Sequence, residues 1–247
     1  MVSNSGFMVE DNVTKALTIQ GLSFRYTKTH EVVKNLSFSV GLGKITGLVG
    51  PNGSGKSTLI RLAGDLLRPQ VGEIRVCGSA STTKEAKIKS IILASNDYLP
   101  EFLTGLEYLR FIHQMYGIEC DLYEVKRLFR RYQMDCRWDD LIEDYSHGMR
   151  KKVQLIAALM VSRPLTMIDE TPNGIDIEAL YSFETDIRNL AQNNCGVLLC
   201  THNFSMLENV ADDIVLMSHG EILVNEECQI LVSEYGSLSA FVKAQFA

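Results

Sequence analysis

The sequence Gly50-Pro51-Asn52-Gly53-Ser54-Gly55-Lys56-Ser57-Thr58 decides the fold of this chain. It follows the apolar run Ile45 to Val49 and precedes a segment with helical spacing, residues 56–67. The pattern G-x-x-x-x-G-K-[ST] in this setting predicts a strand, a glycine-rich loop and a helix whose backbone N–H groups surround phosphate oxygens. We expect Lys56 to reach the β- and γ-phosphates of a nucleotide and Ser57 to bind Mg²⁺. A glycine-rich turn without a ligand is the alternative interpretation, and the spacing and setting of the motif disfavour it.

Asp169 and Glu170 end a second apolar run, residues 165–168. A strand ending there places the Asp169 carboxylate beside the phosphate loop, where it holds Mg²⁺ directly or through water. Glu170 then points to the other side and is a candidate to deprotonate an attacking water. A positioned general base typically contributes about 10² to 10⁴ in rate. The alternative is an acidic strand end that caps a helix.

The order of the apolar runs predicts an α/β fold. Short β-branched or Leu-rich runs alternate with helical patterns, which favours a P-loop NTPase core with a mostly parallel sheet. Residues 16–26 and 33–40 predict an antiparallel β layer, with a turn at residues 28–30. From 104 to 144 the spacing becomes helical, so we expect an inserted α-helical subdomain at about residues 96–160.

Composition limits the classes of function. With 247 residues, 46% of them apolar, the chain is long enough for one α/β core. Its net charge of −6 and pI near 5.4 do not indicate a basic surface that would bind nucleic acid or an anionic membrane. No apolar run approaches the roughly 18 to 20 residues of a spanning helix, so we expect no direct membrane insertion. We expect residues 1–15 to form a disordered tail and not a secretory signal. The six cysteines are far apart, which predicts reduced structural thiols in a cytoplasmic protein.

Three further elements complete the pattern: Tyr145-Ser146-His147-Gly148-Met149, Asn173-Gly174-Ile175-Asp176 and Thr201-His202. With the phosphate loop and Asp169-Glu170, they follow the order and spacing of one family. Over about residues 16–224 the chain resembles the ATP-binding subunit of ATP-binding cassette (ABC) transporters. The resemblance implies that residues 16–247 form one ABC ATP-binding domain whose site is completed by a second subunit.

The resemblance also implies roles for individual residues, with ATP and Mg²⁺ as ligands. The expected catalytic residues are Glu170, His202 and Lys56. The expected ATP contacts come from the phosphate loop, from an aromatic that stacks on adenine, and from the opposite subunit: Tyr26, Gly50, Pro51, Asn52, Gly53, Ser54, Gly55, Lys56, Ser57, Thr58, Ser146 and Gly148. The expected Mg²⁺ ligands are Ser57 and Asp169, and the expected dimer contacts are Ser146, Gly148 and Asp176. Ser146 could instead be a plain helix N-cap, and Phe24 shares a strand face with Tyr26, so either aromatic could be core.

Several positions depart from the family pattern. Ser95, followed by Asn96, stands where the family usually has a glutamine that contacts Mg²⁺, so either residue or a water could take its place. Thr171 and Ile177 replace two usual prolines. The Ser-x-Gly-Met form of residues 146–149 resembles the branch that exports drugs, antibiotics, peptides or lipids.

The expected partners are a separate membrane permease and a second ATP-binding subunit, as in a homodimer, with the chain peripheral on the cytoplasmic face of the membrane. Two alternatives remain: a soluble ABC ATPase that acts outside transport, and a nucleotide-gated regulatory module with little turnover. The cargo, the direction of transport and the choice between homodimer and heterodimer are not specified by the sequence.

Overall fold

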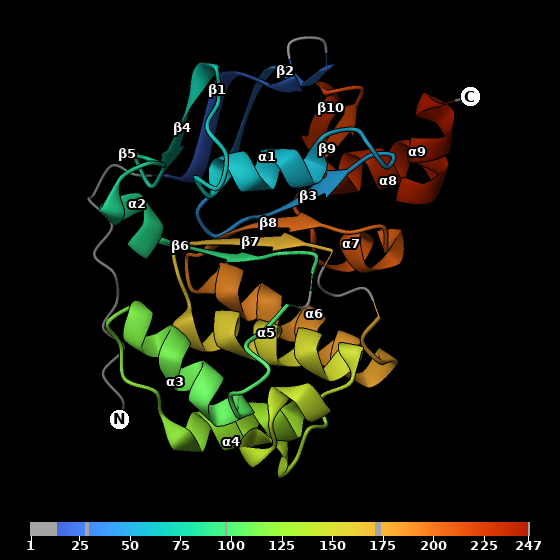
Figure 1. The fold of residues 1–247 in the computed structure, drawn as a ribbon. Helices are drawn as coiled ribbons and strands as arrows, with labels where there is room; N and C mark the ends of the chain where they lie inside the picture. Colours follow the sequence, from blue (N-terminus) through green and yellow to red (C-terminus); the bar gives the residue numbers. More distant parts are fainter. Residues whose placement is uncertain (1–13, 28–29, 97, 171–173, 247) are drawn as a thin grey trace.

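The computed structural model describes residues 14–27, 30–96, 98–170 and 174–246 (Figure 1). The expected tail falls mostly on residues 1–13, which lie outside this description, as do residues 28 and 29 of the expected turn. The first strand already begins at Lys15, the last residue of the expected tail.

Four strands form an antiparallel sheet in the order β2-β1-β4-β5: β1 (Lys15–Thr27), β2 (His30–Gly41), β4 (Val71–Val76) and β5 (Ser79–Ala80). β1 is the central partner, since it pairs with β2 on one side and with β4 on the other. Its apolar side chains Leu17, Ile19 and Leu22 are buried. This sheet confirms the predicted antiparallel β layer.

Six strands form the second sheet in the order β10-β9-β3-β8-β7-β6. Their bounds are β3 (Ile45–Val49), β6 (Ser90–Leu93), β7 (Leu165–Asp169), β8 (Gly196–Cys200), β9 (Asp213–Ser218) and β10 (Glu221–Glu227). β9, β3, β8, β7 and β6 run parallel, and β10 is antiparallel to β9. The predicted mostly parallel sheet is therefore confirmed. Residues 221–227 belong to the same sheet, because β10 pairs with β9.

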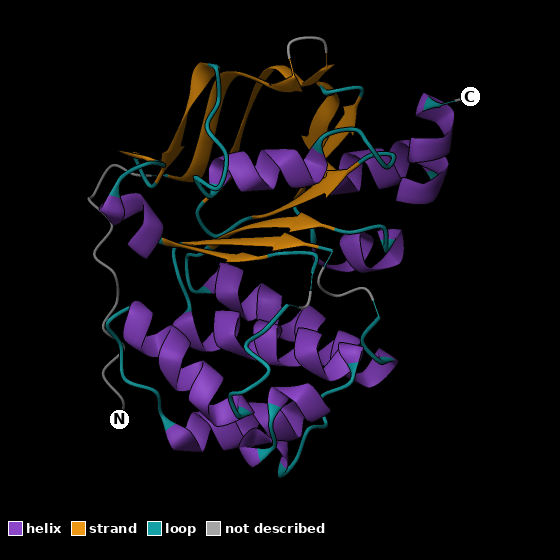
Figure 2. Ribbon diagram, in the orientation of Figure 1, coloured by secondary structure: helices purple, strands orange, loops and turns teal. Residues whose placement is uncertain are grey.

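Helices cover both faces of the parallel sheet (Figures 1 and 2). α1 (Lys56–Ala63) lies between the two sheets, while α5 (His147–Val161) and α6 (Ile177–Gln192) cover the opposite face. Beyond them lie α3 (Gly105–Met115) and α4 (Leu122–Arg131), with two 3₁₀ turns, Arg137–Asp139 and Ile142–Asp144. The remaining helices are α2 (Lys84–Ile88), α7 (Phe204–Val210), α8 (Cys228–Tyr235) and α9 (Leu238–Gln245). In the described part of the chain, no helix combines the length and the apolar character needed to cross a membrane.

The core is divided by the parallel sheet. Val197 and Leu199 of β8 pack into the cluster on the α5 side, whereas Leu198 and Cys200 pack into the cluster beneath α1. This alternation follows from the two-residue period of a strand that is buried on both faces. All five residues of β3, β7 and β8 are buried for the same reason.

The sheet order places four loops side by side. β3, β8, β7 and β6 are consecutive parallel neighbours, so their carboxyl ends lie along one edge of the sheet. Ligands of open α/β sheets bind at this edge. The segments that leave it are, in spatial order, residues 50–55, 201–203, 169–170 and 94–96.

Candidate active site

The loop that follows β3 packs closely on neighbouring backbone. A Cβ added to Gly50 would lie 2.1 Å from the carbonyl oxygen of Met217, and one added to Gly55 would lie 2.7 Å from that of Val32. Gly55 also has φ of 106°, a left-handed conformation that favours glycine, at the N-cap of α1. Lys56 begins α1 and folds back over the loop, where its Nζ donates to the carbonyls of Gly50 at 2.8 Å and Pro51 at 3.0 Å. The loop therefore holds an ammonium group and a helix N-terminus together, which suits a phosphate chain.

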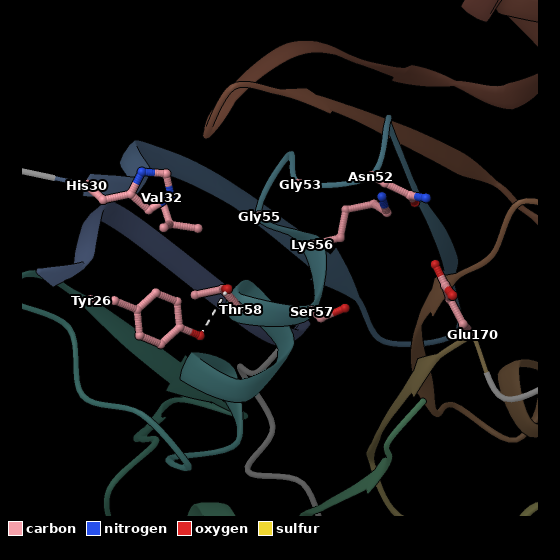
Figure 3. Close-up of a pocket in the computed structure, with 10 residues that line it drawn as sticks. All are labelled: Tyr26, His30, Val32, Asn52, Gly53, Gly55, Lys56, Ser57, Thr58 and Glu170. Atoms are coloured by element: carbon pink, nitrogen blue, oxygen red, sulfur yellow. Dashed lines mark hydrogen bonds between the residues drawn. The ribbon is translucent and has the colours of Figure 1, made fainter. Parts of the chain in front are cut away.

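A cavity of about 270 Å³ opens beside this loop (Figure 3). It is lined by Tyr26, His30, Val32, Asn52, Gly53, Gly55, Lys56, Ser57, Thr58 and Glu170. Lys56, Ser57 and Glu170 lie toward one end and Tyr26, His30 and Val32 toward the other. The cavity thus has charged and hydroxyl side chains at one end and aromatic rings at the other, which fits a ligand with a phosphate chain and a flat ring system.

Tyr26 and Phe24 occupy different environments. Phe24 is 6% exposed and belongs to the core, whereas Tyr26 is 50% exposed and faces the cavity. Their rings meet edge to face with centroids 4.9 Å apart, and the Tyr26 hydroxyl lies 3.3 Å from Oγ1 of Thr58. The structure thus gives Phe24 the packing role and leaves Tyr26 available to stack on a base.

Ser57 and Asp169 form a set of hard oxygen donors. The Ser57 hydroxyl donates to Oδ1 of Asp169 over 3.2 Å, although the two residues are 112 positions apart in the chain. Burial raises the pKa of Asp169, while hydrogen bonds from Ser57 and Cys200 act in the opposite direction. A hydroxyl and a buried carboxylate beside a phosphate loop fit Mg²⁺, which prefers one or two carboxylates together with phosphate oxygens.

Glu170 has an unusual backbone conformation. Its φ is 54°, in the left-handed region, and its N–H donates to the Cys200 carbonyl at 2.9 Å. The turn directs the Glu170 side chain into the cavity, where Oε1 lies 3.0 Å from Nε2 of His202. Strained backbone of this kind costs about 1 to 3 kcal/mol and clusters at functional sites. The arrangement holds a carboxylate where it can orient and deprotonate water.

The second group of predicted residues lies elsewhere. Ser146 caps α5, and its Oγ accepts from the N–H of Met149 at 3.3 Å. Asp176 caps α6 and accepts from the N–H of Ala179 at 2.9 Å. Among the residues that line the cavity, none comes from 146–148 or from 174–176. One chain therefore does not bring these residues to the phosphate loop.

Ser95 and Asn96 leave β6 next to the end of β7, but neither lines the cavity. The carbonyl of Asn96 accepts from Nε2 of Gln154 on α5 at 3.2 Å. Gly50, Pro51 and Ser54 shape the loop without lining the cavity, and Thr171 and Asn173 lie outside the described residues.

Three residues at or near the site were not predicted from the sequence: His30, Val32 and Gln154. His30 and Val32 line the cavity from β2, although His30 was assigned to a turn. Their two-residue spacing on a strand opposite Tyr26 could have indicated them. Gln154 could not be found, because its contact with Asn96 depends on how α5 crosses the sheet.

Comparison with known proteins agrees with this geometry. Residues 33–173 match the ABC transporter family. The chain is 30% identical over 228 residues to the daunorubicin/doxorubicin resistance ATP-binding protein DrrA of Streptomyces peucetius, covering 91% of this chain and 69% of that protein. It is 27% identical over 209 residues to the SkfA peptide export ATP-binding protein SkfE of Bacillus subtilis, covering 84% of this chain and 87% of that protein. A solved ATP-binding subunit of an ABC transporter superposes with a TM-score of 0.87 at 26% identity, over 94% of this chain and all of that one. The chain belongs to the ABC transporter family as an ATP-binding subunit.

Proposed function

We propose that this chain hydrolyses MgATP at a site divided between two copies, and that it thereby powers export through a separate membrane permease. One observation supports the conclusion that the site is divided between two copies. The cavity gathers the phosphate loop, Tyr26 and Glu170, while Ser146 and Gly148 stand outside it at the N-terminus of α5. A cavity of about 270 Å³ is also below the roughly 300 to 1,000 Å³ of sites that enclose a ligand.

Each copy contributes binding and acid–base groups to its own nucleotide. Tyr26 stacks on the base, Lys56 and the loop N–H groups hold the phosphates, and Ser57 with Asp169 hold Mg²⁺. The metal, when bound, neutralises charge on the phosphate oxygens. Glu170 takes the proton of the attacking water, and His202 orients Glu170 through their 3.0 Å contact.

The other copy supplies Ser146 and Gly148. A serine hydroxyl and the backbone N–H groups at a helix N-terminus offer donors to an anion, and the helix dipole adds to the attraction. Ser146 and Gly148 therefore contact the γ-phosphate bound by the opposite subunit. Removal of that phosphate by hydrolysis separates the copies, which makes closure the step that does work on the permease.

Export is the direction supported by the relatives and by the Ser-x-Gly-Met form of residues 146–149. DrrA and SkfE are named for drug resistance and peptide export. We place the small-molecule, peptide and lipid classes among the candidate cargoes. The chain would work as a homodimer at the cytoplasmic face of the membrane.

The contact with the permease lies beside β6. The connection from β6 to α3 and the outer face of α3 expose four large apolar side chains: Tyr98, Phe102, Phe111 and Met115. Large apolar side chains that stay exposed to water are candidates for contact with another protein. Tyr98 and Phe102 belong to the same connection as Ser95 and Asn96, so a permease bound there would contact a segment that leaves the carboxyl edge of the sheet.

The test is purification of the tagged chain from gently solubilised native membranes. A polytopic membrane protein recovered in stoichiometric amount supports the transport role and identifies the permease. Recovery with ribosomes or DNA, or without any partner, rejects the transport role and leaves the ATPase chemistry in place.

A further inference from the structure

Lys152 of α5 forms an ion pair with the carboxylate that begins α6. Its Nζ contacts Oδ2 of Asp176, and the lysine side chain is only 7% exposed, against 47% for its partner. The other carboxylate oxygen of Asp176 accepts from the N–H of Ala179, so this side chain caps α6 as well. A single carboxylate thus fixes the start of α6 to the body of α5.

The start of α5 and the segment that precedes α6 also pack closely through their backbones. A Cβ added to Gly148 would lie 3.3 Å from the carbonyl oxygen of Gly174, which leaves little room for a larger residue. A Cβ added to Gly174 would lie 3.8 Å from Cδ2 of His147. Residues 146–148 and 174–176 are therefore adjacent, and we call them together the α5–α6 corner.

The charges at the corner are strongly dependent on each other. Partial burial opposes ionisation of Asp176, but its contacts with Lys152 and the N–H of Ala179 outweigh this and lower the pKa of Asp176. Lys152 has almost no access to water that could replace the carboxylate. Removal of the Asp176 carboxylate leaves the buried Lys152 ammonium uncompensated, which is costly in a way that removal of an exposed pair is not, whereas removal of Lys152 leaves a half-exposed carboxylate without its partner.

We infer that Lys152 is a positioning residue for the divided site: its ion pair with Asp176 holds the α5–α6 corner in the shape that a second copy must meet. This inference rests on the proposed function, in which Ser146 and Gly148 contact the nucleotide of the opposite subunit. Without the Lys152–Asp176 pair, the α5–α6 corner would become ordered only when the two copies associate. The free-energy cost of that ordering lowers the affinity of the copies for each other. Lys152 touches neither the phosphate loop nor the cavity of its own chain, so binding of ATP to one chain is unaffected.

The experiment uses the Glu170→Gln chain as the parent, because slow turnover should preserve the ATP-bound dimer. Sedimentation equilibrium with MgATP gives the dimerisation constant of the parent, of Lys152→Met, of Asp176→Asn and of the double variant. Asp176→Asn keeps a side-chain oxygen for the cap of α6. Arg131→Met is the control, since Arg131 of α4 pairs with Asp186 of α6 at 2.8 Å, away from the corner.

Each single variant should weaken ATP-dependent dimerisation about tenfold, and the double variant should be no weaker than either single one, because contacting residues are coupled. Nucleotide affinity of the single chain should equal that of the parent. Arg131→Met should lower the thermal midpoint without changing the dimerisation constant. Equal dimerisation of parent and Lys152→Met, or costs that add in the double variant, would overturn the inference. A parent that stays monomeric in MgATP would instead count against the proposed function.

Discussion

Nε2 of His202 lies 3.0 Å from Oε1 of Glu170, and the two residues leave neighbouring strands, β8 and β7, at the same edge of the sheet. The contact joins the side chain that follows Thr201 to the carboxylate that points into the cavity. Glu170 lines the cavity beside the phosphate loop, and the contact with His202 restrains its carboxylate there.

Glu170→Gln should lower ATP turnover by about 10² to 10⁴ while nucleotide affinity stays within a few fold, because the amide cannot accept a proton from water. Steady-state phosphate release and equilibrium binding of a fluorescent nucleotide measure the two quantities. Glu119→Gln, at an exposed position between α3 and α4, is the matched control and should keep the parent rate. Equal turnover in Glu170→Gln and the unmodified chain would reject Glu170 as the base.

His202→Ala should lower turnover by roughly 10- to 100-fold, the range expected for loss of a hydrogen bond to a charged group. Since His202 acts through Glu170, the double variant Glu170→Gln, His202→Ala should turn over no more slowly than Glu170→Gln alone. Single-turnover hydrolysis compares the three variants. If the losses multiply in the double variant, His202 has a role independent of Glu170.

Tyr26→Ala should weaken ATP binding by about 3- to 10-fold, and Tyr26→Phe should leave it nearly unchanged, because aromatic stacking contributes about 0.5 to 1.5 kcal/mol. The phenylalanine variant loses only the 3.3 Å contact with Thr58. Calorimetric titration with ATP distinguishes the two. A large loss in Tyr26→Phe would show that the hydroxyl matters more than the ring.

The thiols should differ sharply in reactivity. Cys136 is exposed, whereas burial raises the pKa of Cys77 to about 11, so Cys77 stays protonated and unreactive at pH 8. Cys120 is only partly exposed and burial raises its pKa as well, so a chromogenic thiol reagent should show one fast phase per folded chain, which Cys136→Ser removes. Raising the pH toward 11 should increase the reactivity of Cys77 only to the extent that reagent reaches it. A fast phase that survives in Cys136→Ser would contradict this assignment.

Sequence patterns predicted the elements whose structure follows from the residues within them. The loop 50–58 fixed a strand, a tight turn and a helix, and the apolar runs before Asp169 and before Thr201 are strands that are buried on both faces. Their order in the sheet is a tertiary property, and it alone brings Ser57 within 3.2 Å of Asp169.

Other features could not be predicted. Residues 221–245 have mixed composition, and β10 forms because β9 offers an edge for pairing. The ion pair of Lys152 could not be predicted, because a basic residue on a helix has no local signal that Asp176 will pack against it. The choice between Phe24 and Tyr26 also needed the structure, since burial and not residue type separates them.

Contact of Ser146 with the nucleotide of a second copy is tested by the mass of Glu170→Gln in solution with and without MgATP. The mass should change from that of one chain, 27.6 kDa, to that of two, and should return to that of one chain on adding Ser146→Arg, with nucleotide still bound. Ser237→Arg, which removes the comparable N-cap of α9, should leave the dimer intact. A chain that stays monomeric in MgATP, or a dimer that tolerates Ser146→Arg, would contradict the divided site.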